Sequence, residues 1–329
     1  YGNSDISEKD ALESDDIFRI ASMTKPIVSV ALMMLHEEGK FKLNDPVYKY
    51  IPEFKNLTVK KRKKTKPVKN HVKIIDLLRH SAGLNFKGPD DYRKVIDLSL
   101  EEYTKESIKS PLKFEPGTTW WYSYATDICG YLIEVLSQEK LDVFLKSRIF
   151  DPLEMNDTFF ELPNSKLDRL TTLYVVDENK ELVSFDNKTN TPFKDKVVLL
   201  NGSGGLLSTT DDYLKFSFML LNNGLYNEKQ IIKKETLDLM KEDHSLGLKY
   251  KKLAFGKKKG FGLGFEVVKE DGTKFGSKGT FGWGGMFGTY FRVDPKENMV
   301  FIYMTQSFET YKLKLADKFR ALVYESIIK

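Results

Sequence analysis

The sequence predicts an α+β fold, in which an antiparallel sheet is flanked by helices and carries an inserted, mainly helical lobe. Apolar residues at helical spacing dominate the middle of the chain, whereas runs rich in β-branched and aromatic residues dominate after residue 260. Because a sheet must bury its apolar face, we expect the first and last helices to cover it. On this basis residues 1–45 and 196–329 form the sheet domain, and residues 46–195 form the helical lobe.

The first predicted helix begins near Ser22 and ends at Gly39. Pro26 is compatible with the first turn, where a backbone N–H has no intrahelical use. The apolar residues of this helix recur at intervals of three and four, on one face: Ile27, Val30, Ala31, Met34 and Leu35. Further helices are predicted at residues 74–79, 125–137, 141–149, 208–223 and 310–328, and strands at residues 261–268, 286–293 and 299–305.

The composition is that of an ordinary globular protein. Of the 329 residues, 41% are hydrophobic and 30% are charged, which excludes a disordered, collagen-like or coiled-coil class. The single cysteine, Cys129, excludes an intrachain disulfide framework and is expected to pack in an apolar helix face. No run of eighteen apolar residues is present, so no membrane span is expected.

The N-terminus gives no targeting signal. The chain starts with Tyr1, and its first residues do not form a signal peptide, so we expect a processed or trimmed product. The compartment is left open between a bacterial cytoplasm and a periplasm.

The basic residues are concentrated in two runs. The net charge is only +5, from 52 basic and 47 acidic residues, which is too mild to indicate a nucleic-acid-binding protein. One run lies at residues 60–69 and a looser one at residues 249–259. Both lack apolar periodicity, so we interpret them as solvated loops, and no nucleic-acid partner is predicted.

Several kinds of catalytic site are disfavoured. The four histidines lack the spacing of a zinc site, so no metal is predicted. No glycine-rich run matches a phosphate-binding or dinucleotide-binding loop, and the Gly-x-Ser-x-Gly elbow of α/β-hydrolases is absent.

The remaining candidate is the tetrad Ser22-Met23-Thr24-Lys25 at the start of the first helix. Residues three apart are neighbours on a helix, so the Lys25 amine can reach the Ser22 hydroxyl. The helix N-terminus also stabilises negative charge and offers free N–H groups to an oxyanion. Two further Ser-x-x-Lys tetrads, at residues 110–113 and 137–140, lie in a Pro-broken loop and at a helix end, where catalytic geometry is not expected.

Residues 18–26 resemble the nucleophile segment of the serine β-lactamase-related family, which includes class C β-lactamases, D-Ala-D-Ala carboxypeptidases and family VIII carboxylesterases. Six other segments follow in the order of that family, and seven ordered segments are more specific than any one of them. They are residues 77–84 (Leu-Leu-Arg-His-Ser-Ala-Gly-Leu), 122–130 (Tyr-Ser-Tyr-Ala-Thr-Asp-Ile-Cys-Gly), 149–155, 204–209, 282–285 (Gly-Trp-Gly-Gly) and 293–295. The resemblance implies a β-lactamase/penicillin-binding-protein-like fold.

The resemblance also implies roles for individual residues. Ser22 would be the nucleophile, Lys25 its activating partner and Tyr122 the phenol that shuttles the proton. The backbone N–H groups of Ser22 and Met286, the latter on an edge strand, would form the oxyanion hole. Substrate contacts would come from Tyr124, Trp283, Gly284 and Gly285. No metal or organic cofactor is implied, and the partner is a small-molecule ester or amide.

Two departures from the family favour an ester as substrate. Trp283-Gly284-Gly285 stands where β-lactamases carry Lys-Thr-Gly, so the lysine that favours a β-lactam carboxylate is missing. Tyr124 replaces the Asn that binds an amide. The sequence therefore predicts a carboxylesterase closest to family VIII, with a β-lactamase or D-Ala-D-Ala peptidase and a non-catalytic binding protein as alternatives.

A third departure concerns the N-terminus. Family members carry a helix and the first strands ahead of the nucleophile segment, whereas only residues 1–16 precede it here. These strands are therefore expected to be missing or supplied separately. His80 is expected to be a buried, hydrogen-bonded structural residue.

Overall fold

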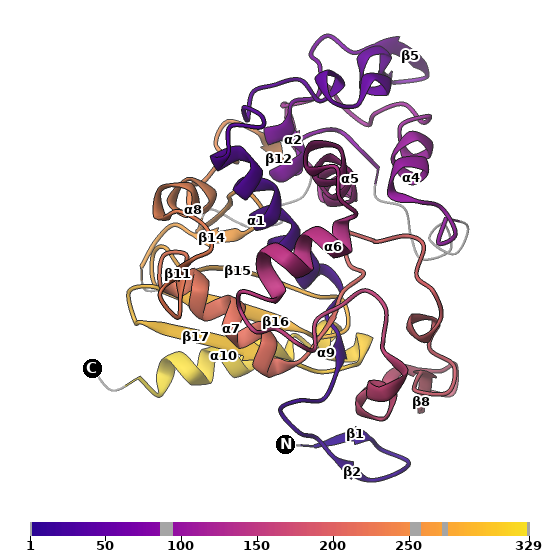
Figure 1. Cartoon of the computed structure of the whole chain (residues 1–329), viewed down its shortest axis with the longest axis vertical. Coiled ribbons are helices and arrows are strands. Elements are labelled where there is room, and N and C mark those ends of the chain that lie inside the picture. The colour runs from indigo at the N-terminus through magenta and orange to yellow at the C-terminus, as the bar shows by residue number, and fades with distance from the viewer. Residues whose placement is uncertain (1, 86–94, 251–257, 272–275, 328–329) are drawn as a thin grey trace.

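The computed structural model describes residues 2–85, 95–250, 258–271 and 276–327. Its centre is a five-stranded antiparallel sheet in the order β13-β14-β15-β16-β17, in which each strand pairs with its neighbour in sequence (Figure 1). The strands are Lys259–Phe261, Glu266–Val268, Phe281–Gly284, Tyr290–Asp294 and Met299–Tyr303. The predicted antiparallel sheet in the last third of the chain is confirmed.

The two faces of the sheet are covered by different helices because side chains alternate along each strand. Phe291 on β16 stacks edge-on against Tyr213 of α7 (Thr210–Leu221), with ring centroids 4.9 Å apart. On the opposite face, Phe301 of β17 contacts Phe319 of α10 (Leu315–Glu325). The sheet is therefore flanked by helices, as predicted. The last helix covers one face, but the packing on the other face comes from α7 and not from the first helix, which was expected there.

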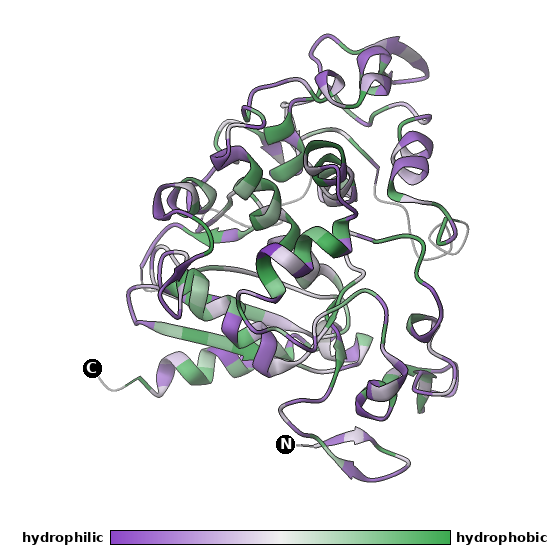
Figure 2. Ribbon diagram, viewed as in Figure 1, coloured by the Kyte–Doolittle hydropathy of each residue, from purple (hydrophilic) through white to green (hydrophobic). Residues whose placement is uncertain are grey.

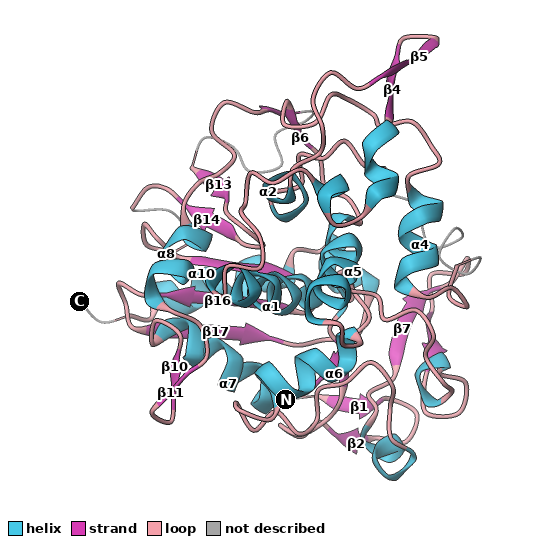
Figure 3. Ribbon diagram, turned by 45° about the horizontal axis from the view of Figure 1, so that its top comes forward, coloured by secondary structure: helices cyan, strands magenta, loops and turns pink. Residues whose placement is uncertain are grey.

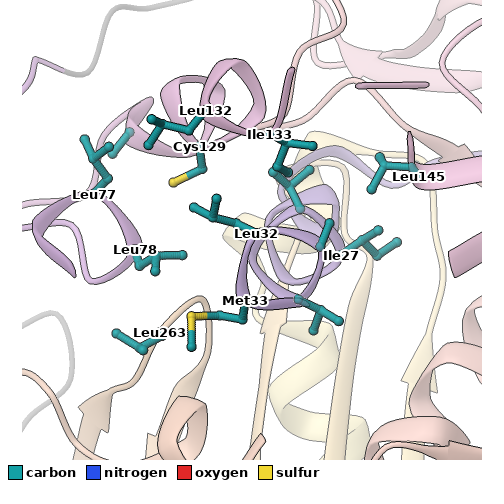
Figure 4. Packing of buried hydrophobic residues seen from close by; sticks show 14 of the residues in the cluster. Ile27, Leu32, Met33, Leu77, Leu78, Cys129, Leu132, Ile133, Leu145 and Leu263 are labelled. Atoms are coloured by element: carbon teal, nitrogen blue, oxygen red, sulfur yellow. The ribbon is translucent and has the colours of Figure 1, made fainter. Parts of the chain in front are cut away.

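Helix α1 (Thr24–Glu37) forms the centre of the hydrophobic core. Every residue from Thr24 to Leu35 is buried, because apolar side chains surround nearly the whole helix. Figure 4 shows Leu32 pointing towards Cys129, with Leu77 and Leu78 on a neighbouring element. The predicted packing role of Cys129 is confirmed, since this residue is fully buried in the core.

Four helices of the middle of the chain form the part that packs on α1: one of them, α5, lies against α1, and the other three pack against α5. They are α2 (Ile74–Leu78), α4 (Leu100–Ser107), α5 (Ala125–Ser137) and α6 (Leu141–Leu145). Figure 2 shows that apolar residues gather on α1 and on the side of α5 that faces it, whereas α4 is largely hydrophilic. The bounds predicted for α5 agree with the structure. The division of the chain into residues 1–45 with 196–329 and residues 46–195 stays our proposal.

Three predictions of secondary structure were wrong in detail. Residues 261–268 are not one strand, since they contain the end of β13, a turn and β14. The turn includes Gly264, whose φ of +97° is incompatible with an extended strand. The predicted strand at residues 286–293 begins only at Tyr290, and β15 before it was missed. The last helix is divided into α9 (Phe308–Lys312) and α10, because Lys314 adopts a left-handed φ of +53°.

The basic run at residues 60–69 is not a loop but a β-hairpin. Strands β4 (Thr58–Lys61) and β5 (Lys64–Pro67) pair with Lys61 opposite Lys64. Figure 3 shows the hairpin projecting from the body of the molecule. Its basic side chains are exposed, so the solvated character predicted for them is confirmed.

The second basic run is only partly described, since residues 251–257 lie outside the described residues. Within it, Lys259 is not solvated. Its Nζ lies 2.9 Å from Glu266 Oε1, and burial lowers the pKa of its ammonium group. The interpretation of this residue as part of a solvated loop was wrong, because β13 places it against the sheet.

The remaining strands form short two-stranded pairs and hairpins. They are β1 (Asn3–Asp5) with β2 (Asp10–Ala11), β3 (Phe18–Arg19) with β9 (Leu207–Ser208), β6 (Thr119–Trp120) with β12 (Lys249–Tyr250), β7 (Leu173–Val176) with β8 (Leu182–Asp186), and β10 (Leu225–Tyr226) with β11 (Lys229–Gln230). A further helix, α8 (Lys234–Lys241), packs near α1. Among the described residues, no helix combines the length and the apolar character needed to cross a bilayer.

Candidate active site

Ser22 lies at a sharp turn between a strand and a helix. Strand β3 ends at Arg19, and a single 3₁₀ turn (Ala21–Met23) leads directly into α1. Ala21 adopts a φ of +46°, a conformation that costs free energy for a residue with a Cβ and is concentrated at functional sites. The turn brings the Ser22 side chain to the N-terminal end of α1.

Lys25 reaches Ser22 from the first turn of α1, as the spacing predicts. Its Nζ lies 3.1 Å from Ser22 Oγ and donates a second hydrogen bond of 2.6 Å to the Ser203 carbonyl oxygen. The residue is only 3% exposed. A buried amine with these two partners is held in one position beside the hydroxyl.

Tyr122 approaches Ser22 from the helical part of the chain. Its hydroxyl donates a hydrogen bond of 2.8 Å to Ser22 Oγ, and its ring centroid lies 4.7 Å from Lys25 Nζ. Ser22 Oγ thus accepts from both an amine and a phenol. An ammonium group this close stabilises a phenolate, so the pair can exchange a proton with the hydroxyl.

Aromatic side chains surround the phenol. Trp283 Nε1 lies 3.4 Å from the Tyr122 hydroxyl, and the two ring centroids are 5.5 Å apart. Phe261 contacts Trp283 edge-on, and Trp120 stacks along Tyr122. This wall gives the site an apolar side, which suits the hydrocarbon part of a substrate.

His80 lies against the same phenol. Its ring centroid is 4.9 Å from that of Tyr122, and burial together with nearby Lys25 holds the pKa of the imidazole well below its usual range. The prediction of burial is confirmed. The predicted hydrogen bonding was wrong for Nδ1, which has no partner among the described residues, because aromatic rings rather than polar groups pack around it.

The segment after β15 lies against the turn that carries Ser22. A Cβ placed on Gly285 would come within 2.5 Å of the Ile20 carbonyl oxygen, so only glycine allows this approach. Thr289 Oγ1 fixes the contact by donating a hydrogen bond of 3.1 Å to the same oxygen. Among the described residues, the backbone N–H of Met286, the next residue, has no backbone acceptor.

The predicted position of Met286 on an edge strand was wrong. Strand β15 is the central strand of the sheet, and Met286 belongs to the turn that follows it. Strand β14 begins at Glu266, opposite Gly282 of β15, and the described pairing of these two strands involves Gly282 and Phe281 of β15. Among the described residues, Trp283 and Gly284 pair with Phe291 and Tyr290 of β16.

Tyr124 lies at the N-terminal cap of α5, two residues after Tyr122. It lines a small crevice together with Leu84, Tyr103 and Ile128. Its role in substrate binding, like that of Gly284, stays a prediction.

The sequence interpretation missed Asp127 and Ser203. Asp127 is fully buried on α5, and its Oδ1 accepts a hydrogen bond of 2.8 Å from the Ser203 N–H. Burial raises the pKa of its carboxyl to about 6. The run Gly202-Ser203-Gly204-Gly205 was rejected as a phosphate-binding loop, and residues 204–209 were used only as one of the ordered family segments, so no signal in the sequence connected Ser203 to Lys25.

The two other Ser-x-x-Lys tetrads do not form such a pair. Ser137 Oγ donates to the Ile133 carbonyl, whereas Lys140 forms an ion pair with Glu134. Lys113 Nζ lies 4.0 Å above the ring of Trp121. In the part of the chain that the structure describes, no three His, Cys, Asp or Glu side chains come together as a metal site.

The arrangement at Ser22 combines a hydroxyl at a helix N-terminus, a buried amine, a phenol and the nearby backbone N–H group of Met286. These are the components of nucleophilic catalysis through an acylated serine.

Comparisons with known proteins agree with the fold. The uncharacterized protein MT1414 of Mycobacterium tuberculosis (strain CDC 1551 / Oshkosh) is 30% identical over 326 residues, which cover 93% of this chain and 81% of that protein. Esterase EstB of Burkholderia gladioli is 31% identical over 161 residues, covering 45% of this chain and 40% of the esterase. A putative D-alanyl-D-alanine carboxypeptidase of Escherichia coli (strain K12) is 28% identical over 322 residues, covering 88% and 68%.

Among solved structures, EstCE1, described as a hydrolase with promiscuous acyltransferase activity, superposes with a TM-score of 0.79 at 24% identity. The match covers 96% of this chain and 88% of EstCE1, so it shows a common fold. The family model described as Beta-lactamase matches residues 1–325, nearly the whole chain. The chain therefore belongs to the β-lactamase family, whose members are serine hydrolases of the β-lactamase and penicillin-binding-protein fold.

Proposed function

We propose that this protein hydrolyses carboxylic esters through an acyl-enzyme formed on Ser22. The observation that carries the proposal is the pair of hydrogen bonds at Ser22 Oγ, 3.1 Å from Lys25 Nζ and 2.8 Å from the Tyr122 hydroxyl. A serine hydroxyl needs a base to become a nucleophile, and these are the two groups within reach.

The acylation step starts from the phenolate form of Tyr122, which the Lys25 ammonium stabilises and which accepts a hydrogen bond from Ser22 Oγ instead of donating one. Ser22 Oγ then attacks the ester carbonyl carbon while its proton passes to the Tyr122 oxygen. The carbonyl oxygen becomes an oxyanion, which the backbone N–H groups of Ser22 and Met286 would bind. The C–O bond to the alcohol then breaks, and the alcohol leaves with the proton from Tyr122. This leaves Ser22 esterified.

In the deacylation step, water attacks the acyl carbonyl and gives its proton to Tyr122. The bond to Ser22 Oγ breaks, and the serine oxygen takes the proton back. The carboxylic acid is released, and Ser22, Lys25 and Tyr122 return to their starting protonation states.

An ester is favoured over a β-lactam because of the residue at position 283. Trp283 offers an indole ring beside the Tyr122 hydroxyl, where a lysine of the Lys-Thr-Gly segment would offer a charge for a β-lactam carboxylate. The surrounding Phe261 and Trp120 rings extend this apolar wall. Esterase EstB, a relative of this chain, agrees with this substrate class.

The test compares p-nitrophenyl acetate, butyrate and octanoate with nitrocefin, for the wild type, Ser22→Ala and Ser137→Ala. Ser137 belongs to a tetrad whose serine and lysine do not meet, so it is the matched control. We expect Ser22→Ala to abolish ester turnover and Ser137→Ala to retain it. A fluorophosphonate should label the peptide that contains Ser22, and equal activity of Ser22→Ala and wild type would contradict the proposal.

A peptidase or β-lactamase activity is the second candidate, since a relative of this chain is described as a putative D-alanyl-D-alanine carboxypeptidase. Nitrocefin opened as fast as a short ester, and lost in Ser22→Ala, would favour this candidate. If a folded wild type neither hydrolyses any probe nor reacts with the fluorophosphonate, the third alternative, a non-catalytic binding protein, gains support.

A further inference from the structure

Asp127 is a buried acid close to the candidate nucleophile that the mechanism above does not use. It lies in the first turn of α5, five residues after Tyr122, and its side chain is fully buried. Oδ1 accepts the Ser203 N–H, whereas Oδ2 has no partner among the described residues. A carboxyl group in this environment costs free energy, so its presence calls for a physical reason.

Two consecutive hydrogen bonds connect Asp127 to Lys25. Asp127 Oδ1 accepts from the Ser203 N–H at 2.8 Å, and the carbonyl of the same residue accepts from Lys25 Nζ at 2.6 Å. The Asp127 carboxyl therefore fixes Ser203, the residue whose carbonyl oxygen holds the lysine. Lys25 Nζ in turn lies 3.1 Å from Ser22 Oγ.

The glycine before Ser203 makes this arrangement possible. A Cβ on Gly202 would lie 2.8 Å from the Thr126 carbonyl oxygen and 3.5 Å from Asp127 Cα. The turn at residues 201–203 therefore lies directly on the start of α5. Asn201 Oδ1 also accepts the Ser203 N–H, at 2.9 Å, which further restricts the turn.

Lys25 is the cation that acts on the Asp127 carboxyl. Burial raises the pKa of this carboxyl to about 6, and the Lys25 ammonium and the backbone N–H groups of Ser203 and Gly202 limit the rise. At neutral pH the carboxyl group is therefore charged and balances the lysine.

The other elements packed against α5 present mainly apolar groups. Gly130 of α5 lies against Leu141 of α6 and Leu100 of α4. On α5 itself, burial raises the pKa of the Cys129 thiol, so it is neutral. His80, whose imidazole is also influenced by Lys25, is neutral as well, since burial keeps its pKa well below the usual range.

We propose that Asp127 is a positioning residue for the Ser22–Lys25 pair: its carboxylate holds the Ser203 carbonyl against Lys25 Nζ, and its negative charge balances the Lys25 ammonium in the buried site. The inference rests on the proposed function for its kinetic consequences. It also makes a structural claim that does not depend on turnover.

The kinetic test compares Asp127→Asn and Asp127→Ala with the wild type. Asn keeps the size and one acceptor oxygen but removes the charge, whereas Ala removes both. We expect Asp127→Asn to lower the rate of Ser22 acylation at pH 7.5 about tenfold, less than the loss of about 100-fold or more expected for a group that itself transfers the proton. Asp127→Ala should lose more than Asp127→Asn.

The pH profile separates this role from a merely structural one. In the wild type the acylation rate should fall as the pH drops through about 6, because the Asp127 carboxyl takes up a proton. Asp127→Asn lacks this titration, so its rate should show no step at that pH. The wild-type and Asp127→Asn rates should therefore converge at low pH.

The matched control is Asp212→Asn. Asp212 is also a buried acid that accepts a backbone N–H, from Asp157 at 2.7 Å, but it lies on α7 and forms an ion pair with Lys215. This variant should keep both the rate and the pH step even if its stability falls. An Asp127→Asn enzyme with the wild-type rate and the wild-type pH step would overturn the proposal.

A crystal structure of Asp127→Ala tests the positioning role without any turnover. We expect the Ser203 carbonyl oxygen to move out of hydrogen-bond distance of Lys25 Nζ, from 2.6 Å in the wild type. An unchanged contact in that structure would overturn the proposal even if the kinetics agreed. A wild type that neither turns over esters nor reacts with a fluorophosphonate would contradict the proposed function instead, and leave this structural test in force.

Discussion

The Tyr122 hydroxyl donates a hydrogen bond of 2.8 Å to Ser22 Oγ, although the two residues are 100 positions apart in the sequence. Tyr122 follows β6 and precedes α5, and α5 packs against α1, which begins two residues after Ser22. The contact between two helices thus brings the phenol to the serine. Proton transfer between Tyr122 and Ser22 therefore depends on the packing of the apolar faces of α1 and α5.

Tyr122→Phe should lower ester turnover by about 100-fold to 10,000-fold, the range for removal of a group that transfers protons. The ring and its contacts with Trp283 and His80 remain, so binding should change less than the chemical step. The measurement is kcat and KM for p-nitrophenyl butyrate.

The control for this substitution is Tyr50→Phe. This substitution also removes a hydrogen bond from a tyrosine hydroxyl, the 2.7 Å bond from Tyr50 to Asp45, but Tyr50 does not belong to the candidate active site. Its activity should equal that of the wild type. An active Tyr122→Phe enzyme would mean that Lys25 alone accepts the proton from Ser22.

Gly285→Ala should reduce activity by about 100-fold or more, the cost of losing one oxyanion donor. Its Cβ would collide with the Ile20 carbonyl oxygen and, more closely still, with Thr289 Oγ1, so the turn that carries the Met286 N–H has to move. The loss should appear in kcat for each of the three esters.

Gly204→Ala is the matched control, because Gly204 also lies beside Ala21. The nearest atom to its added Cβ is at 3.5 Å, which is ordinary van der Waals contact. We expect activity close to that of the wild type. If both alanine variants lost activity equally, the oxyanion role of the segment after β15 would not be supported.

His80→Asn should change how stability depends on pH. The folded protein keeps the imidazole neutral because its pKa lies well below the usual range, whereas the unfolded chain takes up a proton as the pH falls below about 6.5. The unfolded state then binds more protons, so this histidine removes stability as the pH falls, by about 1.4 kcal/mol per pH unit. Asn tolerates the φ of +57° at this position.

The measurement is the free energy of unfolding in urea at pH 7.5, 6.5, 5.5 and 4.5 for both proteins. The Asp127 carboxyl has the opposite effect on the free energy of unfolding. Because its pKa in the folded protein is raised to about 6, its contribution to stability increases as the pH falls below about 6. That contribution is common to both proteins and cancels in their difference. The variant should therefore gain stability relative to the wild type below pH 6.5, and parallel curves would show that His80 is not buried as a neutral ring.

The sequence determined those features that depend on near neighbours in the chain. The three-and-four spacing of apolar residues gave the correct position of α1 and the bounds of α5, since a helix is stabilised by contacts within four residues. For the same reason, the i, i+3 spacing of Ser22 and Lys25 predicted their proximity. The seven ordered segments indicated the family because each is a run of neighbouring residues, which the sequence shows directly.

Only the tertiary structure decided the features that depend on distant residues. A break between α9 and α10, the turn at Gly264 and the central position of β15 are set by packing against other elements, and local patterns do not encode them. The link from Asp127 through Ser203 to Lys25 joins three separate segments, and of these three residues the sequence analysis had given a chemical role only to Lys25. The sequence alone thus identified Ser22 as the candidate nucleophile. Only the fold placed the buried Asp127 carboxyl near Lys25, because this neighbourhood results from the packing of α5 and of the turn at Gly202-Ser203 close to α1.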